Sequence, residues 1–201
     1  AFNTNVLRAA ADFVKQQQQA GLQVQLQPIG NKAVDGLVAR GFAKLLVQPQ
    51  RDVARHLGAR FAQSLAAGLV DDFTQGQCDA VYLLYNRFVS ALVQKPTQVG
   101  LLPVAAVAEM TATPVAALEY EPSAAEVLAD ALPRFLAVQL LQAGQESQAS
   151  EQGARMTAMD NATRNAGGMV KKLSLVYNRT RQANITRELI EIISGAEAIH
   201  G

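Results

Sequence analysis

The sequence predicts an α/β fold in which a layered domain is followed by one long helix. Up to about residue 122, segments with helical spacing alternate with short segments rich in Val, Tyr, Leu and Phe, as expected where helices cover a sheet. A helix start follows at Ser123, and the chain has no proline after Pro133. We therefore divide it into an α/β domain over 1–122, a connecting helix over 123–147 and a long C-terminal helix over 148–201.

The composition is that of a folded, globular chain. Of its 201 residues 49% are hydrophobic and 17% are charged, which excludes general disorder, and the net charge of +1 gives no general attraction to nucleic acid or anionic lipid. Cys78 is the only cysteine, so no internal disulfide can form, and we expect it to be a small buried residue. No apolar run reaches the roughly 20 residues of a membrane span, so we expect no direct membrane insertion.

Two helices and one strand are predicted at the start of the chain. The first helix has Thr4 or Asn5 as its N-cap and ends at Gly21. Residues 22–30 alternate apolar side chains with glutamine, which predicts a half-buried strand. A short helix then ends at Gly41.

A third helix and two strands complete the predicted domain. Residues 51–73 place apolar side chains at helical spacing, from Val53 to Leu69. The segments 79–91 and 97–105 are rich in residues that favour strands, and we place a turn between them at Lys95 and Pro96. Strands separated by helices indicate a Rossmann-like layered α/β domain with a largely parallel sheet and a hairpin at its edge.

The second part of the chain is helical. Ser123 followed by Glu126 forms a capping box, and Pro133 is expected to kink or interrupt the helix two turns later. From 148 to 199 we predict one helix of roughly 50 residues, which spans about 75 Å. A helix of that length cannot lie within a domain of this size.

The long helix carries a coiled-coil seam. Apolar residues recur at alternating steps of three and four, which is the heptad pattern of a two-stranded coiled coil. The seam residues are Met159, Ala162, Ala166, Met169, Leu173 and Val176. Nothing in residues 1–122 is long enough to cover them, so we predict that the partner helix lies outside this sequence.

Charge is unevenly distributed along this helix. Between Asn161 and Arg187 there are six basic residues and no Asp or Glu. These are Arg164, Lys171, Lys172, Arg179, Arg181 and Arg187. A solvated polar face and a face presented to an acidic protein surface are equally weighted readings. Nucleic acid is a poorer partner, because Tyr177 is the only aromatic residue in this stretch and no DNA-binding motif is present.

The sequence contains no recognisable active site. Neither glycine-rich phosphate-binding motif occurs, and no serine lies in a G-x-S-x-G elbow. His56 and His200 are far apart and have no ligand spacing, and the adjacent carboxylates of Asp71 and Asp72 would point apart on a helix. We predict no catalytic residue, no cofactor and no metal.

Two stretches of the long helix closely resemble one known family. SEQGARMTAMDNATRNA, over 150–166, and YNRTRQANITRELIEIISGAEAI, over 177–199, are similar to the gamma subunit of F-type ATP synthases, in its mitochondrial or alpha-proteobacterial branch. The terminal signature of the family is matched by Ile185, Thr186, Glu188, Glu191, Gly195 and Ala196.

The resemblance implies a central rotor shaft with no chemistry of its own. The shaft would couple proton-driven rotation to conformational changes at the catalytic beta subunits, within a ring of alpha and beta subunits. Arg181 and Gln182 match the pair that faces the acidic catch loop of a beta subunit, and residues 185–199 would enter an apolar collar. The first domain would form a foot beside an epsilon- or delta-type stalk subunit and the membrane c-ring. The subunit would be peripheral, on the cytoplasmic face of a bacterial inner membrane or the matrix face of the mitochondrial one.

The resemblance also supplies a partner for the seam. In this family an N-terminal helix pairs with the C-terminal helix as an antiparallel coiled coil, and that helix and the first strand are expected to be absent here, where the chain opens with Ala1. Gly167 and Gly168 depart from a good helix interior. Two alternatives stay open. A coiled-coil scaffold would bind a single helical partner, and a small Rossmann-like enzyme would show ligand-dependent melting.

Overall fold

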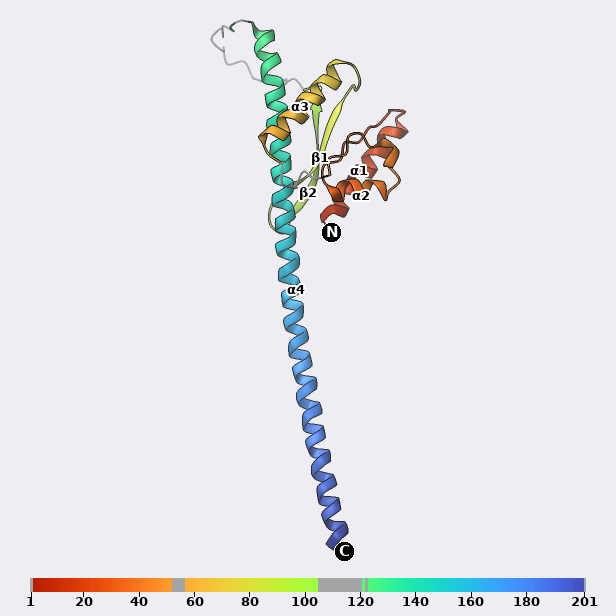
Figure 1. The fold of residues 1–201 in the computed structure, drawn as a ribbon, viewed down its shortest axis with the longest axis vertical. Helices are drawn as coiled ribbons and strands as arrows, with labels where there is room; N and C mark the ends of the chain where they lie inside the picture. Colours follow the sequence, from red (N-terminus) through yellow and green to blue (C-terminus); the bar gives the residue numbers. More distant parts are fainter. Residues whose placement is uncertain (1, 52–56, 105–120, 122, 201) are drawn as a thin grey trace. The chain divides into compact units, whose positions relative to one another are not determined.

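A computed structural model describes residues 2–51, 57–104, 121 and 123–200 of the chain (Figure 1). It comprises two compact units, Ala1–Ala154 and Arg155–Gly201. In its described residues, the first unit contains three α-helices, a two-stranded sheet and the first part of a long helix. The second unit is the remainder of that helix.

Helix α1 (Phe2–Gln19) ends where the sequence predicts. Gly21 adopts a positive φ of 79°, and its N–H donates to the carbonyl oxygen of Gln18 at 3.0 Å. Glycine reaches this left-handed conformation without a steric penalty, so it stops the helix. The start differs from the prediction, because Thr4 and Asn5 lie inside the helix. Their assignment as N-caps was wrong.

The predicted strand over 22–30 is not a regular strand. It is an extended segment joined to residues 46–50 by two isolated parallel bridges, Leu26 to Leu46 and Ile29 to Gln50. Helix α2 (Asn31–Val38) follows as predicted, and a short 3-10 helix, η1 (Ala43–Leu45), lies beyond Gly41. Between these two segments, the parallel strand pairing that was expected for the sheet consists of these two isolated bridges.

Helices α1 and α2 pack closely on each other. Leu7 and Val14 of α1 and Val34 and Leu37 of α2 are buried. Gly36 permits the contact, because a Cβ built there would be 2.3 Å from the Cδ1 atom of Leu7. The apolar residues that recur at helical spacing in α1 and α2 are thus buried against each other, as expected for amphipathic helices.

Strands β1 (Val81–Phe88) and β2 (Gln94–Leu102) confirm the two predicted strands and pair as an antiparallel hairpin (Figure 1). The turn was placed wrongly, because Lys95 and Pro96 lie within β2. The chain turns instead at residues 89–93, where the N–H of Val93 donates to the carbonyl oxygen of Ser90 at 3.1 Å. Proline lacks an N–H and is tolerated at the edge of a sheet, which suits a strand of a two-stranded sheet.

Helix α3 (Ala59–Thr74) covers most of the third predicted helix, whose residues 52–56 lie outside the described part of the chain. It shares a core with β2 and with the first part of the long helix. The buried residues of this core are Ala62, Ala66, Leu101, Leu102, Leu136, Ala137 and Leu140. The alanines of α3 let its backbone approach the neighbouring elements, which suits the dense packing of a core.

Helix α4 (Ala124–His200) is one continuous helix of 77 residues. Its start confirms the predicted cap, since the N–H of Glu126 donates to the hydroxyl oxygen of Ser123 at 3.3 Å. Pro133 does not interrupt it. Proline removes one backbone hydrogen bond, and burial of Leu136 and Ala137 one turn later stabilises the helix across that position. The boundary placed at residue 147 thus coincides with no break, and the functional division there stays a prediction.

Candidate functional site

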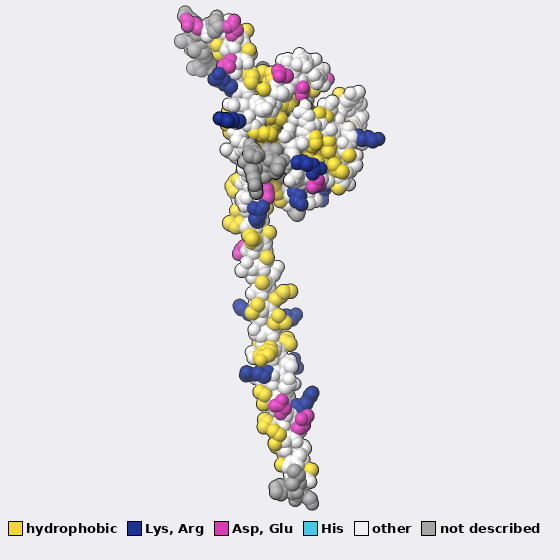
Figure 2. All heavy atoms as spheres, in the orientation of Figure 1, with side chains coloured by type: hydrophobic (Ala, Val, Ile, Leu, Met, Phe, Trp, Pro, Cys, Tyr) yellow, Lys and Arg dark blue, Asp and Glu magenta, His cyan; other side chains and the backbone are white. Residues whose placement is uncertain are grey.

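The second unit is a helix whose side chains face solvent. Its residues 155–200 span about 70 Å, and every described side chain from residue 158 onward is exposed. Large apolar residues are among them, with Met159 65%, Leu173 67% and Ile192 68% exposed. Figure 2 shows hydrophobic side chains in yellow along the helix, interspersed with basic and acidic ones. Exposed apolar surface of this extent indicates interaction with other proteins.

The six predicted seam residues lie on one side of the helix. At about 100° per residue, they fall within an arc of about 100°. All six are exposed, and the four larger side chains are Met159, Met169, Leu173 and Val176. The structure therefore places them together, as a coiled-coil seam requires. Whether a helix covers them stays a prediction.

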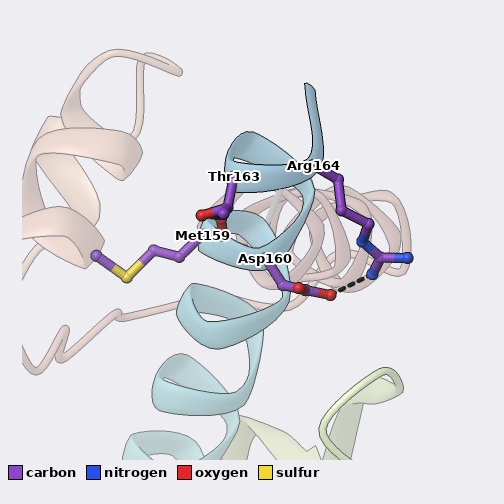
Figure 3. A network of polar contacts seen from close by, with 4 residues as sticks. All are labelled: Met159, Asp160, Thr163 and Arg164. Carbon is purple, nitrogen blue, oxygen red and sulfur yellow. Dashed lines mark hydrogen bonds and ion pairs between the residues drawn. The ribbon is translucent and has the colours of Figure 1, made fainter. Parts of the chain in front are cut away.

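One basic residue of the stretch is neutralised within the helix. Arg164 forms an ion pair with Asp160, one turn earlier, and the hydroxyl of Thr163 donates to the carbonyl oxygen of Met159 at 3.0 Å (Figure 3). The other five basic residues form no ion pair with the described part of the chain. They are Lys171, Lys172, Arg179, Arg181 and Arg187. Their positive charges are available to an acidic surface.

Several of these basic residues point away from the seam. In a heptad frame with Met159 at position a, Lys171 occupies position f, on the far side of the helix. Lys172 and Arg179 occupy position g and Arg181 occupies position b, so they flank the seam on its two sides. A partner helix on the seam would leave these side chains facing outward.

Arg181 and Gln182 are adjacent, and both are exposed. Neither forms a side-chain hydrogen bond with any described residue. An arginine fork and a neutral amide side by side can donate to one carboxylate-bearing loop. Their role as a contact for the catch loop stays a prediction.

The terminal signature lies on α4, and it divides between two sides of the helix. The apolar residues Ile185, Leu189, Ile192 and Ala196 recur at steps of four, three and four, and all four are exposed. This terminal face lies about 140° around the helix from the seam. Glu188, Gly195 and Glu191 lie about 70–130° from the centre of this face in one direction, and Thr186 lies about 90° from it in the other. The expectation that residues 185–199 enter one apolar collar did not distinguish these sides.

No chemical site emerges in the described residues. They contain no group of three or more His, Cys, Asp or Glu side chains that could hold a metal ion. His56 and the side chain of His200 lie outside the described part. Burial, aided by the carboxylates of Asp72 and Asp79, raises the pKa of the Cys78 thiol, so this partly buried residue is protonated near neutral pH. In the described ranges no helix has both the length and the apolar character that a membrane span requires.

Known proteins that are similar in sequence to this chain are ATP synthase gamma chains. The family described as ATP synthase matches residues 1–199. The ATP synthase gamma chain of Rhodospirillum rubrum is 48% identical over 207 residues, which cover 98% of this chain and 69% of that one. The gamma chain of Chelativorans sp. (strain BNC1) is 44% identical over 201 residues, covering 99% and 69%.

Solved structures show the same likeness. A chain from the central stalk and c-ring of the Tetrahymena thermophila mitochondrial ATP synthase matches with a TM-score of 0.61 and 25% identity, covering 80% of this chain and 69% of that one. A chain from the Euglena gracilis mitochondrial ATP synthase has the same fold, with a TM-score of 0.61 and 22% identity over 95% of this chain and 67% of that one. On this evidence, the protein belongs to the ATP synthase gamma chain family.

Proposed function

We propose that this chain is the central rotor shaft of an F-type ATP synthase. It would couple proton-driven rotation to conformational changes at the catalytic beta subunits, for ATP synthesis and hydrolysis. The observation that carries the proposal is the second unit, a helix of about 70 Å that exposes a seam, a basic stretch and a terminal apolar face on different sides. A shaft enclosed by other subunits needs such surfaces, whereas an isolated helix does not.

The distribution of these surfaces suits a rotating part. Because the seam and the terminal face lie about 140° apart, the helix has no rotational symmetry. Each step of rotation therefore presents a different combination of charge and apolar surface to a given neighbouring subunit. The shaft acts on each surrounding subunit as a binding partner that favours one of its conformations, because a partner shifts a conformational equilibrium by its differential contacts with the two conformations. Subunits of one ring that meet different sides of the shaft are therefore forced into unequal conformations.

We assign the seam to a second gamma helix, in an antiparallel coiled coil. The spacing of Met159 to Val176 predicts a helical partner, and the family resemblance makes it the N-terminal helix. With that helix in place, Arg181 and Gln182 would remain accessible to the acidic catch loop of a beta subunit. Arginine is suited to this contact because its planar fork can donate two hydrogen bonds to one carboxylate.

The two ends of the chain would contact different partners. The terminal face of Ile185, Leu189, Ile192 and Ala196 would lie within the apolar collar formed by the alpha and beta subunits. The first unit would serve as the foot, beside an epsilon- or delta-type stalk subunit and the c-ring. The chain itself would be non-catalytic and peripheral to the membrane, on the cytoplasmic face in a bacterium or the matrix face in a mitochondrion.

Direct observation of rotation tests the proposal. Gln77 is exposed beside the single cysteine, so Gln77→Cys with Cys78→Ser gives one accessible attachment point for a bead on the first unit. In a complex with alpha and beta subunits and a complete gamma chain, addition of ATP is expected to turn the bead in one direction. A scaffold that binds one helix would associate without turning, and a bead that stays still in an active complex would contradict the rotor role.

A further inference from the structure

The β1–β2 hairpin is fastened to α4 by a buried polar contact. The hydroxyl of Ser150 on α4 donates to the backbone carbonyl oxygen of Asn86 on β1 at 3.1 Å, across 64 positions of sequence. Ser150 is 0% exposed and Asn86 is 3% exposed. Because both residues are buried, water can reach these two groups only if the hairpin and the helix separate. Loss of the hydrogen bond would otherwise leave a buried polar group unpaired, which is costly.

One turn further along, the hairpin turn touches the helix directly. A Cβ built at Gly153 would be 3.2 Å from the Cα atom of Ala91 and 3.3 Å from the Cε2 atom of Phe88. A side chain at this position would therefore force the neighbouring atoms of the hairpin to shift by a few tenths of an ångström. At Gly144 the neighbour is a side chain rather than backbone, since a Cβ there would be 2.3 Å from the Cδ2 atom of Leu57.

Together these contacts allow only one register of the hairpin on the helix. A shift by one residue would move the helix about 1.5 Å and turn it by about 100°. The hydroxyl of Ser150 would then be out of reach of Asn86, and Gln152 or Ala154 would bring a side chain against the turn. Both changes are unfavourable, so sliding and twisting are opposed by the same contacts.

We propose that Asn86, Ala91, Ser150 and Gly153 form a rigid joint, the hairpin joint, that fixes the hairpin to α4 against torque. The inference rests on the proposed rotor function, in which force that reaches the first unit must enter the helix without slip. A continuous helix can transmit that force only if the surrounding elements cannot turn around it. The hairpin joint supplies this restraint through the hydrogen bond of Ser150 and the close backbone approach at Gly153, one helical turn apart.

Hydrogen exchange in the assembled complex tests whether the hydrogen bond holds the hairpin. Ser150→Ala is expected to speed exchange of the β1 and β2 amides about fivefold, the effect of losing one hydrogen bond on a local opening equilibrium. Exchange in α1 and α2 should be unchanged, which separates a local joint from general destabilisation. Ser174→Ala, an exposed serine on the same helix, is the matched control. Unaltered hairpin exchange in Ser150→Ala would overturn the proposal.

A second variant tests the backbone contact of the joint. Gly153→Ala is expected to speed exchange of the β1 and β2 amides in the assembled complex, because the turn must move to admit the methyl group. Gly168→Ala, at a position where a Cβ would meet nothing within 4 Å, is the matched control and should leave hairpin exchange unchanged. Hairpin exchange that Gly153→Ala does not alter would overturn the rigid joint. A complex whose hairpin exchange responds to Ser150→Ala, but whose attached bead never turns, would instead contradict the rotor function and leave the joint standing.

Discussion

Gly153 of α4 lies so close to Ala91 of the hairpin turn that a Cβ at Gly153 would be 3.2 Å from the Ala91 Cα atom. Gly167 and Gly168 of the same helix are in the opposite situation, with nothing within 4 Å of a Cβ at either position. Three glycines of one helix therefore differ in what they do. The first permits a contact, and the other two lower the stability of the helix, because glycine has the most backbone freedom to lose on folding.

We predict that replacing Gly167 and Gly168 together by alanine raises the free energy of unfolding by about 1–2 kcal/mol, since each glycine costs roughly 1 kcal/mol in a helix interior. Gly153→Ala is expected to lower it, because the turn must move to admit the methyl group. Urea unfolding of the assembled chain compares the two variants. Destabilisation by the double substitution would show that a neighbouring helix packs directly onto that position.

The seam is expected to determine whether the second unit is fully folded. Adding a peptide with the N-terminal helix of a gamma chain should raise the helical circular dichroism signal and the melting temperature, because the exposed seam from Met159 to Val176 then acquires a partner. Leu173→Glu should abolish the gain by placing a charge in the seam. Leu175→Glu, on the far side of the helix and also exposed, should preserve it. An unchanged spectrum on mixing would count against the coiled coil.

Arg181 and Gln182 are predicted to grip the catalytic ring. Arg181→Ala should remove a charge-assisted contact worth about 1.5–3 kcal/mol and lower ATP turnover or coupling, while nucleotide binding at the beta sites persists. Arg181→Lys should rescue only partly, because the charge remains but the planar fork is lost. ATP hydrolysis and proton pumping by reconstituted complexes provide the measurement.

The matched control for the grip is Arg134→Ala. Arg134 is an exposed arginine of the same helix, and its guanidinium pairs with Asp130 at 2.9 Å. It lies in the first unit and outside the basic stretch, so its loss should leave both activities unchanged. Wild-type hydrolysis and pumping in the double variant Arg181→Ala with Gln182→Ala would rule out this pair as the grip.

The stability of the chain is expected to fall in alkaline solution through Tyr85. Burial, and secondarily the Glu146 carboxylate, raises the pKa of the Tyr85 phenol from its ordinary value of 10.0, and Arg87 opposes the rise in part. A raised pKa in the folded state means that the stabilising contribution is present below pH 10 and is lost as the pH rises through the raised value. Tyr85→Phe should flatten this alkaline loss in urea titrations, and Tyr177→Phe, at an exposed site, should not. Equal profiles for Tyr85→Phe and the unchanged chain would contradict the prediction.

Local sequence signals determined several elements of the fold by themselves. The capping box at Ser123, the helix stop at Gly21 and the two strands of the hairpin each depend on a few neighbouring residues, and each is confirmed. The seam residues share one side of α4 because heptad spacing fixes direction along any helix. The family resemblance, carried by the same helix, is confirmed by the match over residues 1–199.

Tertiary packing decided the rest, because its contacts join residues that no local pattern relates. Leu136 and Ala137 are buried beside Pro133, and this burial carries the helix past a residue expected to interrupt it. Lys95 and Pro96 resemble a turn, yet pairing of β2 with β1 keeps them in a strand. Ser150 and Asn86 are 64 positions apart, and neither carries a motif. Their hydrogen bond exists only once α4 and the hairpin have packed, so the hairpin joint could be found only in the folded chain.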